Sequence, residues 1–481
     1  MHHGLRFCRV SGWLSRGAWL AAGEVLVVAL VLGCNGDRGT NRSRMVSGGK
    51  VAPLESRFSK EQDFAFVLPQ LAPVAGVGGV RASHCGVCHR AIYREWQAST
   101  HASALSDLQF QAELSKKSSP RWLCLNCHIP VQNQRRHLVQ GLVGGDVLRP
   151  ALVKNPGFDA AMQAEAITCA TCHVRRDDQG RSVVVGTRGN PEAPHPVRAD
   201  PKALRNICKR CHDPRGERIT PLLVCWFQTY KELSEGPHGG KRDCVGCHMP
   251  VSRRRLASEF SAYPVRKNRQ HHWVGGGVPK RFGGYGRLAE RGYHPGLVVK
   301  LVRAERAAGV VGFEAELENR RSGHALPTAD PERHLLLLAT LRASDGRRQG
   351  QKRSRIGQVW KWVPRAEKVS DNRLSPGGKR WWKGSFSAAA STGAVTLELK
   401  IWHVRLTSKN AEHMKKARVR EDYVPGLSKL LRSLERHYPL ATLVYREVVD
   451  LATGKRIRST AAQLIRTSAA EQRLPLNARD Y

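Results

Sequence analysis

Five copies of the pentapeptide C-x-x-C-H dominate the first half of this chain and constrain its fold more than any other feature. They lie 36 to 45 residues apart, at 85–89, 124–128, 169–173, 208–212 and 244–248. C-x-x-C-H is the attachment signal for c-type haem. On a helical turn, two thiols three residues apart share a face and can bond one haem, while the following histidine binds its iron. The sequence therefore predicts five covalently bound haems c.

The motifs assign ten cysteines and five histidines to these haems. The cysteines predicted to form thioethers are Cys85, Cys88, Cys124, Cys127, Cys169, Cys172, Cys208, Cys211, Cys244 and Cys247. The histidines predicted to bind iron from the motif side are His89, His128, His173, His212 and His248.

Zinc and disulfides are the two alternatives for so many cysteines. Paired C-x-x-C units build tetrahedral zinc sites, but five units cannot be paired, and zinc ribbons need no histidine after every second cysteine. A disulfide framework explains the repeated C-x-x-C-H pattern less well than a cofactor does. The motifs leave only Cys8, Cys34 and Cys225 of the 13 cysteines. We expect Cys225 to be a buried apolar thiol.

The N-terminal segment 1–33 has the pattern of an export signal. Three arginines precede an apolar run at 25–32, which is too short to span a bilayer. The run ends at Cys34 in V-L-G-C, which resembles the lipobox of bacterial lipoproteins, where the cysteine is lipidated. We expect an exported protein in the periplasm or at the outer membrane, anchored to the membrane through a lipid on Cys34. The alternative is an ordinary cleaved signal in which Cys34 is incidental.

The chain is strongly basic, with 79 Lys and Arg against 40 Asp and Glu and a formal net charge of +39. Such a charge often indicates nucleic-acid binding, but the chain has an export signal and no nucleic-acid motif. Haem propionates would offset only part of the charge. We therefore expect no nucleic-acid partner. An acidic redox partner protein or an anionic membrane surface is expected instead, with an attraction that weakens as salt rises.

Composition and pattern divide the chain further. Residues 34–80 are rich in Gly, Arg and Ser and predict a flexible tether. Residues 84–295 contain all five motifs and few periodic runs, which predicts short helices and loops around haems. From 296 to 481 alternating segments such as 311–318 and 395–401 predict antiparallel strands. The expected fold class is α+β, with a mostly loop and short-helix pentahaem module followed by an antiparallel β-sandwich.

Other histidines are candidates for the second axial position of each iron. His101 and His238 end matching segments, Y-R-E-W-Q-A-S-T-H and Y-K-E-L-S-E-G-P-H, which we interpret as two copies of one haem-binding unit. A chance match between surface helices is the alternative. His195 lies between two prolines on a stiff segment that can aim it at an iron. Of the adjacent His271 and His272, one is expected to bind iron, and His272 is favoured.

His324 is the most distant candidate, because it lies in a region without a haem motif. In the segment S-G-H-A-L-P-T a glycine precedes it and a proline follows three residues later. The glycine permits a sharp turn or a close approach of the backbone, and the proline stiffens the chain that follows. One hypothesis makes His324 a distal ligand that reaches into the haem module. The alternative is a turn histidine with local hydrogen bonds.

Several segments in order resemble the multihaem c-type cytochromes, the superfamily that includes the tetrahaem electron acceptor of hydroxylamine oxidoreductase. The matching segments are 88–101, 167–174, 247–250, 272–276 and 319–328. The resemblance implies haem-mediated electron transfer, irons with two histidine ligands, and a β-sandwich appended to the haem module. Where relatives often have a second histidine after the H-W-V-G-G run, this chain has Gly277, which leaves one distal ligand unassigned.

Two function classes remain. We expect an electron-transfer protein of the bacterial cell envelope and not an enzyme. The alternative is an enzyme related to nitrite reductases or hydroxylamine oxidoreductase, in which one haem keeps an open position for substrate. Pentahaem nitrite reductases typically carry one C-x-x-C-K motif, whereas all five motifs here end in histidine. The site decides between the two classes, since one fold supports both.

Overall fold

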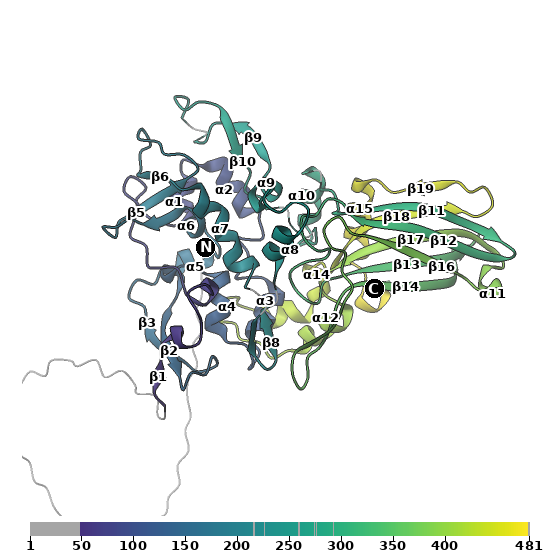
Figure 1. Cartoon of the computed structure of the whole chain (residues 1–481), viewed down its shortest axis with the longest axis horizontal. Coiled ribbons are helices and arrows are strands. Elements are labelled where there is room, and N and C mark those ends of the chain that lie inside the picture. Colours follow the sequence, from purple (N-terminus) through teal and green to yellow (C-terminus); the bar gives the residue numbers. More distant parts are fainter. Residues whose placement is uncertain are drawn as a thin grey trace, which may run out of the picture. The chain divides into compact units, whose positions relative to one another are not determined.

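Two kinds of local structure follow each other along the chain and change near residue 295. Before it, short helices and small hairpins alternate with loops, and after it long strands dominate (Figure 1). The computed structural model describes residues 49–479 except 215, 216, 226, 258, 259, 274, 276 and 292, and these residues belong to one compact unit. The expected signal at 1–33 and Cys34 lie outside them. Within the described part, no helix is both long enough and apolar enough to cross a bilayer.

The first kind of structure forms the haem-motif region, which we define as residues 82–290. Its helices are α1 Ala82–Gly86, α2 Arg90–Gln97, α3 Leu108–Leu114, α4 Arg121–His128, α5 Ala160–Ala164, α6 Cys169–His173, α7 Pro201–His212, α8 Thr229–Glu235, α9 Cys244–His248 and α10 Gly284–Glu290, with the 3-10 turn η3 Gln132–Gln134. Its strands are β2 His137–Val143, β3 Pro150–Lys154, β4 Val174–Arg176, β5 Ser182–Gly186, β6 Val197–Ala199, β7 Glu217–Thr220, β8 Leu223–Cys225, β9 Val251–Arg254 and β10 Arg266–Arg269. The strands form small sheets only, in the orders β1-β2-β3, β4-β5-β6, β7-β8 and β9-β10.

Local sequence explains where the motif helices begin and end. Asp200 caps α7 by accepting from the amide of Ala203, and Pro201 occupies the first turn, where its missing N–H costs nothing. Asp243 caps α9 in the same way, accepting from the amide of Gly246. The helices α4, α6, α7 and α9 each end on a motif histidine. The chain therefore leaves the helix directly after the residue that is expected to bind iron.

Residues 49–80 pack against the haem-motif region, which differs from the tether expected for 34–80. The strand β1 Val51–Ala52 pairs with β2, and two 3-10 turns follow, η1 Leu54–Ser56 and η2 Asp63–Ala65. Phe58 is buried and its ring meets Trp122 of α4 edge to face at 6.1 Å. Apolar residues in this segment are irregularly spaced, so no helical or strand period reveals them in the sequence.

The second kind of structure forms the two-sheet region, residues 297–458. Its strands are β11 Leu297–Ala307, β12 Val310–Asn319, β13 His334–Ala343, β14 Arg348–Lys361, β15 Glu367–Asp371, β16 Lys379–Ser385, β17 Ala394–Val404, β18 Ala441–Asp450 and β19 Arg456–Arg458. They pair antiparallel in the orders β11-β12-β16 and β15-β14-β13-β17-β18-β19. The helices within and after this region are α11 Ala388–Ser391, α12 Ser408–Lys416, α13 Leu427–Arg432, α14 Leu434–His437 and α15 Ala461–Glu471, with the 3-10 turn η4 Leu476–Ala478.

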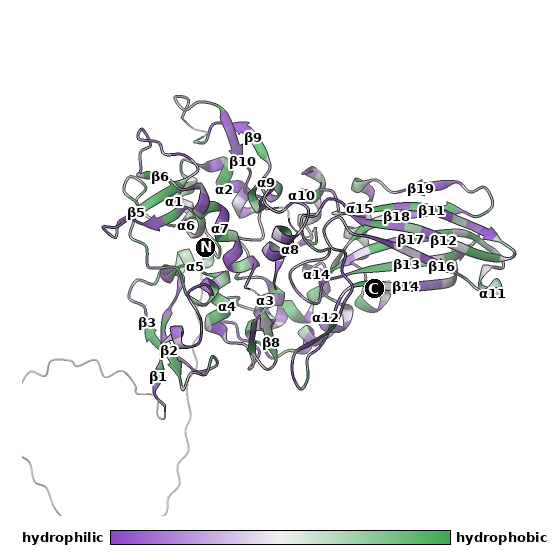
Figure 2. Cartoon of the chain, viewed as in Figure 1, coloured by the Kyte–Doolittle hydropathy of each residue, from purple (hydrophilic) through white to green (hydrophobic). Residues whose placement is uncertain are grey.

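The two sheets share one hydrophobic core, and hydrophilic and hydrophobic residues alternate along their strands (Figure 2). The predicted alternation at 311–318 lies in β12, where Val311, Phe313, Ala315 and Leu317 are all buried. The predicted alternation at 395–401 lies in β17, and its apolar face joins the same core. Burial of a continuous apolar face from each sheet is the main stabilising contribution to this half of the chain.

The other face of β17 is covered as well, which the alternation does not predict. Glu398 and Lys400 are only 4% and 7% exposed. Lys400 Nζ lies 3.1 Å from a carboxylate oxygen of Glu471 on α15, and Arg446 donates to Glu398 over 2.7 Å. Charged side chains are buried here because each has a partner of opposite charge.

Helices between β17 and β18 pack against α3 of the haem-motif region. Two short helices, α13 and α14, follow each other directly in this segment. Leu427, Leu431 and Leu434 of these helices share a hydrophobic cluster with Leu108 and Ala112 of α3.

A buried polar cluster lies at the edge of this contact. Asp107 caps α3 by accepting from the amide of Phe110, and its other oxygen accepts from Lys280 Nζ at 2.8 Å and from the Tyr438 hydroxyl at 2.9 Å. Burial alone would raise the pKa of Asp107, but the Lys280 and Arg405 cations outweigh burial and lower it to about 2. Burial lowers the pKa of Lys280 to about 8, although Asp107 opposes that shift.

We expect Asp107→Asn to lower the free energy of unfolding by about 3–5 kcal/mol, because it leaves the Lys280 cation buried without its partner. The pKa of Asp107 is depressed in the folded state, so its stabilisation is complete above pH 4 and is lost as pH falls toward about 2. Urea unfolding of the haem-loaded protein, followed by far-ultraviolet circular dichroism at pH 7 and pH 3, measures both effects. The difference between wild type and variant should shrink at pH 3.

Asp422→Asn is the matched control, because Asp422 also joins the two halves of the chain, through Arg121, but its side chain is 43% exposed. An exposed ion pair contributes about 0–1 kcal/mol. Equal losses in the two variants would show that burial of the Asp107 cluster adds nothing.

Candidate haem-binding site

Three of the five motif histidines are oriented by backbone carbonyls. Nδ1 of His89 lies 3.1 Å from the carbonyl of Leu256, and Nδ1 of His173 lies 2.9 Å from that of Val185. Nδ1 of His128 lies 2.7 Å from the carbonyl of Ala104. A hydrogen bond from Nδ1 fixes the tautomer and leaves Nε2 free to bind a metal.

Burial keeps several of these imidazoles neutral. It lowers the pKa of His128 and of His212 to about 4, and neighbouring imidazoles add to the effect on His212. Burial also lowers the pKa of His173, although its carbonyl partner opposes the shift. A neutral imidazole is the form that binds a metal ion. His128, His173 and His212 therefore favour the protonation state that iron requires.

Four of the five motif histidines face a second imidazole across a gap. The ring centres are 6.4 Å apart for His89 and His195, 6.1 Å for His173 and His271, 6.4 Å for His212 and His101, and 6.4 Å for His248 and His324. A metal–imidazole bond is about 2 Å long, and each ring nitrogen lies about 1 Å from its ring centre. Two imidazoles on one iron thus have centres about 6 Å apart, which is the separation in all four pairs.

Three of the predicted distal ligands take part in these pairs, namely His101, His195 and His324. Burial lowers the pKa of His101 to about 3, so it too is neutral. Nδ1 of His324 lies 3.1 Å from the carbonyl of Ala325. Gly323 lets this segment approach α8 closely, because a Cβ there would lie 2.6 Å from Leu233. The structure thus brings a residue of the two-sheet region to the fifth motif.

The prediction favours His272, but in the structure its neighbour His271 is the one that pairs with a motif histidine, His173. The amide of His271 donates to Glu95 over 2.9 Å, and its Nδ1 lies 3.0 Å from the carbonyl of Arg269. His272 instead turns Nε2 toward Glu95, at 3.8 Å. These contacts were not visible in the sequence.

His238 is placed differently from its prediction. In the described part of the chain no ring contact joins it to a motif histidine. A Cβ on Gly323 would lie 3.8 Å from its ring, and its carbonyl accepts from the amides of Lys241 and Arg242. His238 therefore does not pair with a motif histidine in the described residues as His101 pairs with His212.

The second motif has a different environment. The ring of Phe110 stacks on His128 with centres 3.3 Å apart and planes 3° from parallel. Among the described residues, no second imidazole faces His128.

Contacts between thiols show which motifs are neighbours. The Cys85 thiol contacts that of Cys169, which joins the first and third motifs. Cys127 contacts Cys211, and Cys208 contacts Cys244, so the fourth motif adjoins both the second and the fifth. Helices α6 and α7, which carry the third and fourth motifs, also touch. All five motifs thus belong to one connected cluster.

The residues fit covalently bound haem. The cysteines are not paired as disulfides, and each motif supplies two thiols and one imidazole. In the described residues no three or more His, Cys, Asp or Glu side chains gather as a site for a bare metal ion. The donor sets therefore suit a cofactor that brings its own ring nitrogens better than they suit tetrahedral zinc.

Comparisons with known proteins agree with this geometry. The family model described as cytochrome c554 and c-prime matches residues 84–142. A search of curated proteins finds no match. Among solved structures, a penta-haem cytochrome c552 from Thermochromatium tepidum is similar in fold, with a TM-score of 0.52 and 18% identity over 80% of this chain and 100% of that chain. The chain is thus similar to cytochromes c554 and c-prime over residues 84–142, and similar in fold to a penta-haem cytochrome c552.

Proposed function

We propose that this protein carries electrons through five covalently bound haems, held in a loop-rich module that precedes an antiparallel β-sandwich. The observation that supports this most strongly is the set of four imidazole pairs 6.1–6.4 Å apart. An iron with two imidazole ligands has no position for a substrate. Its chemistry is then to gain and lose an electron.

The contacts between motifs support a connected path for those electrons. The first and third motifs touch through Cys85 and Cys169, and α6 and α7 bring the third and fourth motifs together. From the fourth motif the path branches, because Cys211 contacts the second motif and Cys208 contacts the fifth. The haem of the fourth motif is thus the proposed branch point.

Charge supports an acidic redox partner. A cavity of about 530 Å³ beside Cys244 is lined by Arg205, Lys209, Lys241 and Arg242. A partner with complementary negative charge would be steered to the haem of the fifth motif, and the steering would weaken with salt.

We further propose that the protein acts at the bacterial cell envelope. Export is supported by the signal pattern at 1–33, and a lipid on Cys34 would hold the protein at a periplasmic or outer-membrane surface. Covalent attachment of haem outside the cytoplasm agrees with export.

The second motif supports an alternative function. Because no second imidazole faces His128 among the described residues, its haem iron is the candidate for an open position. The alternative is therefore an enzyme of the nitrite reductase or hydroxylamine oxidoreductase type, with this haem as the reacting group and the other four as its electron supply.

The stoichiometry of haem tests the proposed cofactor. We expect the mature protein to carry five haems, because each motif keeps both thiols and its histidine. Intact mass under denaturing conditions counts covalent haems directly. Replacing both cysteines of one motif, as in Cys124→Ala with Cys127→Ala, should remove one haem. A mass that corresponds to three or fewer haems in the wild type would contradict the proposal.

Spin state tests the two functions against each other. We expect at least four low-spin haems in electron paramagnetic resonance of the oxidised protein, because four motif histidines have a second imidazole about 6 Å away. His101→Ala should add one high-spin haem, because it removes the ligand opposite His212. In the wild type, a high-spin haem that binds one equivalent of cyanide would favour the enzyme. Five low-spin signals and no cyanide binding would exclude the enzyme and leave electron transfer alone.

Membrane attachment tests the location. If Cys34 carries a multiply acylated anchor, Cys34→Ala should release a soluble protein. Fractionation must be done at low and high salt, because the net charge of +39 can itself hold the protein on anionic lipid. Membrane association at high salt that is equal in wild type and variant would rule out the lipid on Cys34.

A further inference from the structure

The two matching segments of the haem-motif region share a glutamate whose role the sequence did not reveal. Glu95 follows Tyr93 and Arg94 on α2, and Glu232 follows Tyr230 and Lys231 on α8. Of the two matching histidines only His101 pairs with a motif histidine in the described residues, but these carboxylates make the same kind of contact. Each carboxylate accepts from a backbone amide of a segment that is distant in the sequence and carries a proposed distal histidine.

Glu95 contacts the backbone of His271 itself. Oε2 of Glu95 accepts from the His271 amide over 2.9 Å. Arg254 donates to both carboxylate oxygens, through Nη1 to Oε1 and through Nη2 to Oε2, the latter over 2.9 Å. The side chains of Glu95 and Arg254 are 12% and 19% exposed. Arg254 also donates to the carbonyl of Arg269, the group that lies 3.0 Å from Nδ1 of His271. The carboxylate and its arginine therefore hold the distal imidazole of the third motif from two sides.

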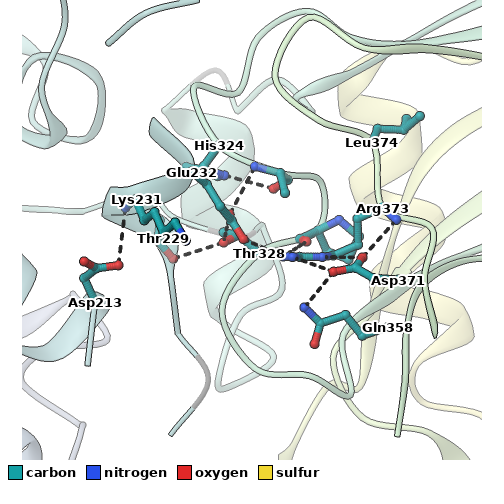
Figure 3. A network of polar contacts seen from close by, with 12 residues as sticks. Asp213, Thr229, Lys231, Glu232, His324, Thr328, Gln358, Asp371, Arg373 and Leu374 are labelled. Atoms are coloured by element: carbon teal, nitrogen blue, oxygen red, sulfur yellow. Dashed lines mark hydrogen bonds and ion pairs between the residues drawn. The ribbon is translucent and has the colours of Figure 1, made fainter. Parts of the chain in front are cut away.

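Glu232 does the same for the segment of His324 (Figure 3). One oxygen accepts from the amide of Ala325 over 3.1 Å and from the hydroxyl of Thr328 over 2.6 Å. The other oxygen accepts from Arg373 over 2.7 Å, and both of these side chains are 13% exposed. The carbonyl of Ala325 is the group that lies 3.1 Å from Nδ1 of His324.

Two further contacts fix this second site. Asp371 accepts from Arg373 on both of its oxygens, over 2.9 Å each, so the guanidinium cannot turn away from Glu232. The hydroxyls of Thr229 and Thr328 lie 3.0 Å apart and join α8 to the same segment (Figure 3).

In each site the carboxylate fixes the peptide group beside the ligand, and the neighbouring carbonyl fixes the ring. A buried ion pair adds little to stability when compared with apolar residues of the same volume, but it can specify one arrangement. An imidazole that is not held in place has to lose rotational freedom when it binds the iron. A carboxylate that holds it in advance removes part of that cost.

We propose that Glu95 and Glu232 are positioning residues for the distal ligands of two haems, with Arg254 and Arg373 as their respective counter-ions. The proposal rests on the proposed function, because it takes His271 and His324 as iron ligands. It assigns Glu95 to the haem of the third motif and Glu232 to that of the fifth. Each carboxylate acts on its own haem and not on the other.

The test compares Glu95→Ala and Glu232→Ala in the full haem-loaded chain. Reference variants are His271→Ala and His324→Ala, which remove the two ligands outright. Glu235→Ala is the control, because Glu235 lies on the same helix as Glu232 but its side chain is 66% exposed. The measurements are haem content by intact mass, the high-spin fraction by electron paramagnetic resonance, and the equivalents of cyanide bound.

We expect each histidine variant to gain one high-spin haem and one equivalent of bound cyanide. Each glutamate variant should gain a partial high-spin signal at its own haem, between wild type and its histidine reference, with five haems retained. In the double variant Glu232→Ala with His324→Ala, the glutamate change should add nothing further. Glu235→Ala should match wild type.

The glutamine variants separate positioning from general stability. Glu95→Gln and Glu232→Gln keep an oxygen that can accept from the backbone amide, so their high-spin fractions should fall below those of the alanine variants. They also provide the comparison if an alanine variant fails to fold.

Two outcomes would overturn the proposal in different ways. If the histidine variants each gain a high-spin haem but the glutamate variants match wild type, the positioning role is wrong and the proposed function stands. If neither histidine variant changes spin state, the ligand assignment fails, and the positioning role fails with it.

Discussion

The proposed bond between iron and imidazole is the constraint on which the rest of this fold would depend. Two rings that bind one iron from opposite sides have centres about 6 Å apart, and four pairs in this chain meet that condition. The four distal histidines come from loops after α2, before β6, after β10 and after β12. Each proposed haem is therefore a cross-link between segments that the chain would otherwise have to join by a larger core. This explains how a region of short helices and small sheets can hold one arrangement, in a chain with only 6% aromatic residues.

Much of the candidate site could be predicted because its chemistry needs fixed residue types at fixed spacing. The thioether cysteines and motif histidines follow from C-x-x-C-H alone. His324 was predicted from its flanking Gly323 and Pro327, and the structure brings it 6.4 Å from His248. The choice between His271 and His272 could not be made, because which of two neighbours faces inward depends on Glu95 in a distant helix. No sequence pattern indicated that the second motif would lack a second imidazole at His128 within the described residues, because that depends on which distant segments the fold brings beside it.

The fold was predictable where one period persists over a whole strand, as in β12. It was less so in β17, where Glu398 and Lys400 indicate an exposed face that α15 and its neighbours cover. The segment 51–80 shows the same difficulty in another form. Phe58 and Phe64 are buried through contacts with residues much later in the chain, and Gly, Arg and Ser around them suggest a linker. In both cases the burial of these side chains depends on residues far away in the sequence, so the local pattern of polar and apolar residues cannot predict it.

The packing of this segment limits how far the proposed haems can lie from a membrane. The described body begins at residue 49, so 14 residues, 35–48, lie between Cys34 and that body in the sequence. A fully extended chain spans at most about 3.3–3.6 Å per residue, so residues 35–48 can separate Cys34 from that body by at most about 50 Å. A lipid on Cys34 would then confine the cytochrome to a thin layer above the bilayer, so that it samples partners by rotation and lateral diffusion within that layer. Electrons would be exchanged with proteins of the same surface, and a soluble carrier would have to enter the layer to reach it.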